Sequence, residues 1–218
     1  MYRIFLVFCS LLLVVGLSVP ALAASHYAND DAYVNSNSPD VAYPALGLWL
    51  TESDPEYRCF VEFTLGSAAV VSANLSMYHI PQWWWTANQT VDLSVEQYNF
   101  DQATLTWNNQ PDASSWTFLG TWAIPQSDQG AWFSQDITSF YNNHLGQTIT
   151  IRLKETYSGW STLDCSAGFE DKEETLHAYG WGDAGNVPRI EFEPVPEPGS
   201  MATLMLGLVG IYLGRRKR

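Results

Sequence analysis

The sequence predicts an all-β fold, a jelly-roll β-sandwich with one short helix. Short segments in which apolar and polar residues alternate recur along most of the 218-residue chain, and turn-forming residues separate them. Almost no stretch has helical periodicity. Hydrophobic residues make up 46% of the chain and charged residues 15%, which is typical of a globular protein and not of a disordered one. A succession of short strands with little helix is typical of sandwiches.

The predicted elements follow from this alternation. Strands are expected at 58–65, 70–80, 91–95, 133–137, 149–153, 161–169 and 190–192. Turns rich in Asn, Gly, Pro and Ser are expected at 35–39, 108–111, 127–130, 157–159 and 182–185. One helical turn is expected over 138–145, because Asp136 or Thr138 can cap its start and Gly146 can end it.

The two ends of the chain do not belong to this domain. Residues 1–24 are typical of a secretory signal helix, with Arg3, an apolar core and a small-residue cleavage site at 21–23. A Pro-rich linker at 194–200 leads to an apolar run at 201–214. That run would form a helix of only about 21 Å, against a bilayer core of about 30 Å, so it is a weak transmembrane anchor. The domain itself is expected at 25–193.

The charge of the domain excludes one class of function. Residues 24–198 hold five basic residues against 23 acidic ones, a formal net charge of −18. This charge repels phosphate backbones, and no basic stripe offsets it, so nucleic-acid binding is excluded. Divalent cations, neutral glycans and simple solubility are all compatible with it.

The cysteines predict a disulfide. Cys59 and Cys165 are the thiols that remain after removal of the signal, and cysteines in an oxidising compartment usually pair. Alternation directs both side chains to the same core if both segments are strands. Two separate buried thiols are the alternative.

The C-terminal segment resembles a PEP-CTERM sorting signal. It has Pro196-Glu197-Pro198, then the short hydrophobic helix of 201–218 and an Arg-rich end that includes Arg215 and Arg216. The resemblance implies a Gram-negative bacterium with a membrane protease of the exosortase type as partner. It implies a precursor anchored in the inner membrane with a cytoplasmic tail, then a secreted or cell-surface protein of an exopolysaccharide or biofilm matrix. A plain C-terminal anchor is the alternative.

The domain also resembles the DNRLRE, or disaggregatase-related, jelly-roll family of carbohydrate-binding modules. The resemblance rests on motifs that occur in the family's order. They are Asp31-Ala32-Tyr33-Val34, the strands 57–65 and 71–78, Leu105–Pro111, Phe133–Thr138 and Pro188-Arg189-Ile190. The departures are Gln135, a Trp-rich insertion at 82–86 and an acidic stretch at 170–186. The motif Thr106–Pro111 has a structural explanation of its own, since Trp can fill the sandwich edge while Asn and Gln tie loop amides together.

Tryptophans are the candidate carbohydrate contacts. Trp83, Trp84 and Trp85 lie in a connection between two strands, where three adjacent indoles cannot all face the core. Sugar rings present C–H faces that stack on indoles. Trp160 and Trp181 lie beside turn glycines and are further candidates. Covering the open end of the sandwich is the alternative role for the triplet.

Acidic clusters suggest a structural calcium ion as cofactor. Asp30 and Asp31 open the domain, and Glu170 and Asp171 lie late in it. Ca²⁺ takes six to eight oxygens, so carboxylates from distant segments with backbone carbonyls would suffice. The resemblance adds that many jelly-roll modules hold an ion near their first and last strands. A solvated acidic loop is the alternative.

No catalytic motif is present. The four His are scattered, and there is no metal-ligand spacing, nucleophile elbow or phosphate loop. The sequence therefore predicts a secreted, non-catalytic domain that binds extracellular polysaccharide. An anionic glycan would need cations or help from Arg152 and Lys154. A structural matrix protein is the first alternative, and a polysaccharide-degrading enzyme the second.

Overall fold

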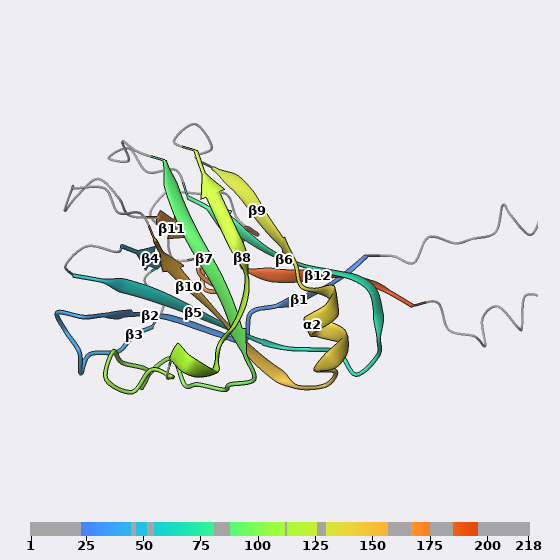
Figure 1. The fold of residues 1–218 in the computed structure, drawn as a ribbon, viewed down its shortest axis with the longest axis horizontal. Coiled ribbons are helices and arrows are strands. Elements are labelled where there is room, and N and C mark those ends of the chain that lie inside the picture. The colour runs from blue at the N-terminus through green and yellow to red at the C-terminus, as the bar shows by residue number, and fades with distance from the viewer. Residues whose placement is uncertain are drawn as a thin grey trace, which may run out of the picture.

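The chain folds into two antiparallel sheets that pack face to face (Figure 1). We describe a computed structural model over residues 23–44, 47–51, 55–80, 88–111, 113–125, 130–156, 167–174 and 185–195. This architecture confirms the all-β sandwich with one short helix. The predicted signal helix and the predicted helix after residue 200 lie outside the described residues.

Sheet A holds the first and last strands of the chain. Its strand order is β1-β12-β6-β11-β4, and β9 pairs with the other edge of β6. The strands are β1 (Ala24–Tyr27), β4 (Leu48–Leu50), β6 (Val70–His79), β9 (Ala131–Asp136), β11 (Ala167–Phe169) and β12 (Arg189–Pro194). β1 and β12 are neighbours, with Ala24 opposite Phe192. β1 thus includes Ala24, the last residue of the predicted signal, and β12 includes Pro194, the first residue of the predicted linker.

Sheet B has the order β3-β2-β5-β10-β7-β8. Its strands are β2 (Asp30–Asn35), β3 (Tyr43–Pro44), β5 (Tyr57–Thr64), β7 (Gln89–Glu96), β8 (Thr117–Ile124) and β10 (Thr148–Glu155). The segment between β7 and β8, which includes a short 3-10 helix (Ala113–Ser115), crosses the outer face of this sheet.

The main apolar core joins the two sheets, and smaller apolar clusters lie apart from it. The main core lies between the sheets, where alternate residues of the paired strands meet, among them Val61, Leu75 and Leu93. A smaller cluster lies on the outer face of sheet B, where Phe60 and Leu105 are buried beneath the segment between β7 and β8. The outer face of sheet B is therefore covered at one side and open toward β7 and β8.

The helix α2 (Thr138–Asn143) lies in the predicted segment, but its N-cap is Ile137, without a side-chain cap hydrogen bond, and not the predicted Asp136 or Thr138. The carboxylate of Asp136 accepts hydrogen bonds from the backbone N–H and the hydroxyl of Thr138, at 2.8 and 2.6 Å. These bonds hold the pKa of Asp136 below its usual value. Gly146 has a φ of 70°, a conformation in which glycine is favoured, and it ends the turn after the helix.

The predicted disulfide between Cys59 and Cys165 is not supported. Cys59 is a buried free thiol, and its Sγ–H donates to the carbonyl of Trp49 at 3.0 Å. The prediction that Cys59 faces the core is confirmed. Cys165 lies outside the described residues. The prediction rested on the tendency of cysteines in exported proteins to form disulfides. That tendency does not take into account that a single buried thiol can donate to a nearby backbone carbonyl, as Cys59 does.

Cys59 is therefore expected to resist alkylation in the native protein. Its side chain has no exposed surface, and burial raises the pKa of the thiol well above its usual value. Iodoacetamide at pH 8, followed by peptide mass spectrometry, should leave the Cys59 peptide unmodified until denaturant is added. Rapid labelling without denaturant would show that β5 is open in solution.

Candidate functional site

Three of the five basic residues of the domain lie on the outer face of sheet B. Arg58 in β5 is opposite Lys154 in β10, and Arg152 is two residues before Lys154 on the same face. β7 continues these rows, because Asp92 pairs with Lys154 and Ser94 pairs with Arg152. The alternation that buries Cys59 and Leu153 thus brings the cations together on the other side of the sheet.

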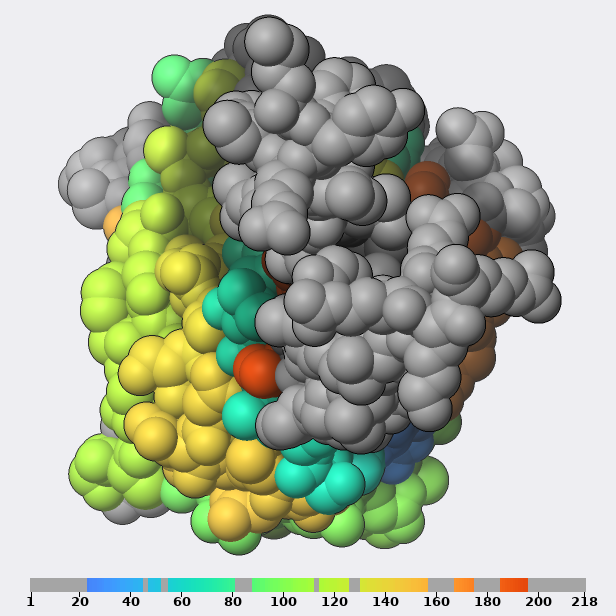
Figure 2. Space-filling view, turned by 90° about the vertical axis from the view of Figure 1, so that its right-hand side faces the viewer, coloured from blue at the N-terminus to red at the C-terminus, as the bar shows by residue number. Residues whose placement is uncertain are grey.

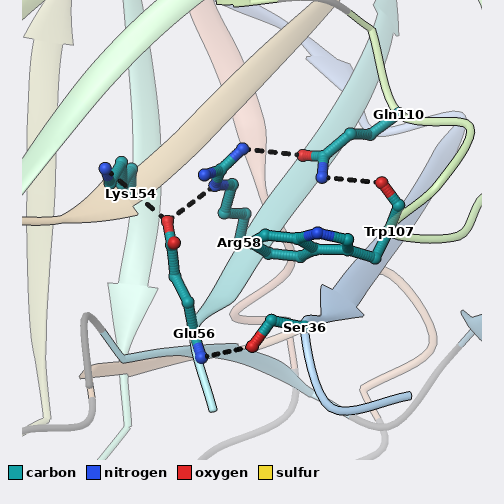
Figure 3. A network of polar contacts seen from close by, with 6 residues as sticks. All are labelled: Ser36, Glu56, Arg58, Trp107, Gln110 and Lys154. Atoms are coloured by element: carbon teal, nitrogen blue, oxygen red, sulfur yellow. Dashed lines mark hydrogen bonds and ion pairs between the residues drawn. The ribbon is translucent and has the colours of Figure 1, made fainter. Parts of the chain in front are cut away.

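Arg58 is held by a polar network that the sequence motif at 106–111 helps to build (Figure 3). Its guanidinium carbon lies 4.4 Å from the ring centroid of Trp107, and its Nε donates to Glu56 at 2.7 Å. Its Nη1 donates to the amide oxygen of Gln110 at 3.1 Å, and the Gln110 amide nitrogen donates to the Trp107 carbonyl at 2.9 Å. The charge of Arg58 is largely neutralised by this network.

The same motif ties its own loop together, as the sequence predicts. The side-chain oxygen of Asn109 accepts from the backbone N–H of Thr106 at 2.6 Å, and its amide nitrogen donates to the carbonyl of Thr104 at 2.8 Å. The motif is therefore structural. It places Trp107 against the sheet and, through Gln110, positions Arg58.

Arg152 is the less satisfied of the two guanidinium groups. It lies over Trp116, with 4.8 Å from the guanidinium carbon to the ring centroid. Its Nε is buried and has no hydrogen-bond partner within the described part of the chain. Burial and the nearby positive charge of Arg58 lower the pKa of Arg152 from its usual value. The buried Nε is out of reach of a ligand, which would bond the exposed part of this half-buried guanidinium instead.

The surface beside Arg152 is open and mixed in character. Lys154 is about one-third exposed, and its Nζ is 3.6 Å from Glu56. Phe118 lies on β8 opposite Ser94 of β7, and it is 60% exposed. Asp92 accepts a hydrogen bond from the Thr121 hydroxyl at 2.6 Å. We call Arg152, Lys154, Trp116 and Phe118 the β10/β8 face. It combines cations, an aromatic platform and hydrogen-bonding groups.

Sheet A carries one comparable pair on its outer face. Arg189 lies over Trp132 at 3.8 Å from guanidinium carbon to ring centroid, and its Nε donates to Glu191 at 2.7 Å. Trp132 also packs against Tyr78, with ring centroids 5.6 Å apart. Because Arg189 already has its carboxylate partner, this pair provides a matched comparison for Arg152.

The structure brings Asp31 within electrostatic range of Asp171 but directs Asp30 to the other face of sheet B. Asp30 and Asp31 are adjacent in β2, so their side chains point to opposite faces of sheet B. Asp30 lies near the Lys172 ammonium at 3.9 Å, whereas Asp31 is fully buried. Asp171 is buried too and accepts from the backbone N–H of Gly47 at 2.8 Å. Glu170 is also buried, next to Asp171 in sequence.

The fit of these residues to calcium is partial. Asp31 Oδ2 accepts from the Lys172 backbone N–H at 2.6 Å, and its Oδ1 has no described partner. Burial, with the charges of Glu173 and Asp171, raises the pKa of Asp31 to about 8. Among the described residues, no three His, Cys, Asp or Glu side chains form a group that could hold a metal ion. Asp31 and Asp171 would thus need backbone oxygens to complete a cation site.

Several predicted site residues lie outside the described ranges. They are the candidate carbohydrate contacts Trp83, Trp84, Trp85, Trp160 and Trp181, and the sorting residues Pro196, Glu197, Pro198, Arg215 and Arg216. Within the described ranges, no helix is long and apolar enough to cross a membrane. The roles of Trp107 and Trp116 as platforms for arginine were not predicted. The alternation of 149–153, extended to Lys154, would have placed Arg152 and Lys154 on one face, but nothing local indicates which indole lies beneath them.

The two packed antiparallel sheets define a β-sandwich domain. The sequence matches carbohydrate-binding module family 96 over residues 23–176, and the chain belongs to that family. It also carries a PEP-CTERM protein-sorting motif at residues 194–218. The predicted resemblance to a carbohydrate-binding jelly-roll module is thereby confirmed under the name of family 96, with which the DNRLRE name is compatible.

Solved structures add little to this assignment. The K3 cleaved adhesin domain of Lys-gingipain from Porphyromonas gingivalis W83 is 8% identical, with a TM-score of 0.37, over 77% of this chain and 94% of that one. A family 28 carbohydrate-binding module specific for non-crystalline cellulose is 10% identical, with a TM-score of 0.28, over 72% of this chain and 90% of that one. Likenesses of this size carry no argument about function. No curated protein matches the sequence.

Proposed function

We propose that this exported protein is a non-catalytic module that binds extracellular polysaccharide on the β10/β8 face. Membership of a carbohydrate-binding module family supports the ligand class, and the sorting motif supports export. The observation that carries the location is Arg152, a half-buried guanidinium that lies on the Trp116 indole beside an open surface. A sugar carboxylate or hydroxyl can accept from the exposed part of this guanidinium while its ring packs on Phe118.

The charge of this face supports the same proposal. The domain as a whole is strongly acidic, but on the β10/β8 face the positive and negative charges are balanced. The cations are Arg58, Arg152 and Lys154, and the carboxylates beside them are Glu56, Asp92 and Glu96. A polysaccharide that bears carboxylates would be repelled elsewhere on the domain and tolerated here. Neutral polysaccharides can use the same hydrogen bonds and aromatic contacts.

The first test is binding by residues 24–198 in affinity electrophoresis, through gels that contain either neutral or uronate-bearing polysaccharides. We expect retardation by at least one polysaccharide and no release of reducing ends. Release would support a degrading enzyme instead. Absence of both retardation and release would support a structural matrix protein that does not bind glycan specifically.

We also propose the connection that contains Trp83, Trp84 and Trp85 as a second contact, with Trp160 and Trp181 as weaker candidates. The support is the sequence argument alone, namely that three adjacent indoles between two strands cannot all enter one core. The matrix or cell surface is the proposed destination of the processed protein, and an exosortase-type protease its proposed processing partner. Both proposals rest on the sorting motif.

A further inference from the structure

Both ends of the described chain leave the sandwich at the same place. β1 begins at Ala24 and β12 ends at Pro194, and the two strands are hydrogen-bonded neighbours (Figure 1). The last backbone bond of the domain joins the N–H of Val195 to the carbonyl of Ala69 at 3.4 Å. The sorting motif therefore starts where the folded sheet stops, without an intervening spacer.

This end of the sandwich is a connected unit, which we call the exit end. It consists of the loop Leu65–Val70, the helix α2 and the chain on either side of Gly146. The side chain of Asn142 bonds both the N–H and the carbonyl of Val70, at 2.9 and 3.0 Å. Gly146 donates to the carbonyl of Gly66 at 2.9 Å. Figure 2 looks at this end, where α2 (yellow) lies beside the turquoise atoms of the chain before β6.

The exit end differs in charge from the rest of the domain. The two segments that build it, 63–72 and 137–151, contain no Asp, Glu, Lys or Arg, although the domain has a formal net charge of −18. Glu193 is the acidic residue that precedes the last described residue by two positions. Ser67, Ala68 and Ala69 are exposed, and Val71 and Val195 are about half exposed. Apart from the exposed Glu193, which pairs with Ser72, the described residues of this end are uncharged, and its surface is partly apolar.

We propose that the exit end rests on the bilayer in the membrane-anchored precursor. This inference depends on the proposed sorting route. At about 3.5 Å per residue, the five residues between Val195 and Met201 reach about 20 Å at most, so the apolar run keeps the exit end near the membrane. Membrane surfaces carry negative lipid charge, which repels the acidic sides of the domain more strongly than the exit end, where Glu193 is the acidic residue described.

The opposite end then points away from the membrane. β5 runs from the far end at Arg58 to the exit end at Thr64, which at about 3.3 Å per residue is roughly 20 Å. Arg152 and Lys154 lie toward the far end of β10, because Lys154 pairs with Arg58. The orientation therefore keeps the β10/β8 face accessible to polysaccharide before the sorting cleavage.

The test places a benzophenone side chain on the full chain from residue 24, reconstituted in vesicles of three parts phosphatidylethanolamine to one part phosphatidylglycerol. Ser67 and, separately, Ala68 probe the exit end. Asn108 is the matched exposed control at the far end, where its backbone N–H bonds the carbonyl of Pro39 beyond β2. After irradiation, lipid adducts at Ser67 and Ala68 should exceed those at Asn108 at least about fivefold.

Two other outcomes overturn the inference in different ways. If the chain floats with the vesicles but gives equal adducts at the three positions, or more at Asn108, the membrane-facing end is wrong while the anchored precursor stands. If the chain does not float with the vesicles, the proposed anchoring fails, and the orientation fails with it.

Discussion

Replacing Arg152 by Met is expected to lower the affinity for a bound polysaccharide at least about tenfold, which corresponds to about 1.4 kcal/mol. The substitution removes a charged donor that would bond the ligand, and hydrogen bonds to charged groups are worth about 1.5–3 kcal/mol. Met keeps an unbranched stem against Trp116, so the packing of the platform is largely preserved. Affinity electrophoresis and isothermal calorimetry measure the loss.

Arg189→Met is the matched control for this experiment. It also removes one guanidinium that lies on an indole, but on the other sheet and beside Glu191. Equal loss of affinity in the two variants would indicate a general effect of charge and would contradict the β10/β8 face. Loss of binding only when Trp83, Trp84 and Trp85 are replaced by Ala, with an unchanged unfolding midpoint, would place the glycan on that connection instead.

Asp31 is expected to make the domain less stable as the pH rises from 6.5 to 8 in the presence of EDTA. Burial raises the pKa of Asp31 from 3.8 to about 8, so in this range the native state holds a proton that the unfolded chain has lost. The native state binds more protons, and the free energy of unfolding therefore falls as the pH rises, by up to about 2 kcal/mol over the interval. Urea titrations at pH 6.5 and 8 measure the difference.

His79 sets the lower limit, pH 6.5, of the pH range in which the effect of Asp31 is measured. Burial lowers the pKa of His79 to about 4, so between pH 4 and 6.5 the unfolded chain binds the additional proton there, and stability rises with pH. Asp31 and His79 oppose each other between pH 4 and 6.5, and above pH 6.5 the contribution of Asp31 remains while that of His79 is essentially complete. Asp31→Asn should remove the fall between pH 6.5 and 8. A wild-type protein whose stability stays constant or rises over that interval would show that Asp31 is ionised in the native state.

The same titration examines the calcium prediction. A cation held by Asp31 and Asp171 would keep the Asp31 carboxylate ionised in the native state, and the loss of stability toward pH 8 would disappear. Millimolar CaCl₂ should then stabilise the wild-type protein at pH 8 but not the Asp31→Asn variant. Equal midpoints with CaCl₂ and EDTA would exclude a calcium site at these residues.

Local patterns in the sequence predicted most of the fold because alternation and turn chemistry act over a few residues. The strand around Val61, the helix that starts at Thr138 and the stop at Gly146 are examples. Cross-sheet relations could not be predicted in this way. Cys59 was correctly placed in the core, but its partner is the Trp49 carbonyl of another strand.

The candidate site illustrates the same limit. The alternation of β10 places Arg152 and Lys154 on one face, but Trp116 reaches Arg152 only because the segment between β7 and β8 folds back over sheet B. Asp30 and Asp31 looked like one acidic pair in the sequence, whereas the strand directs them to opposite faces. Adjacent acidic residues in a strand are therefore poor evidence for a shared metal ion.

The pairing of β1 with β12 has a consequence for the rate of folding during export. β6 receives β9, β11 and β12, which come from three later parts of the chain, and β1 finds its partner only in the last strand. Sheet A therefore cannot be completed until nearly the whole domain has crossed the membrane, and contacts so distant in sequence form slowly. Until then the edge of β6 that receives β12 remains unpaired, so the newly exported chain is most vulnerable to aggregation and to proteolysis just before its C-terminal strand arrives.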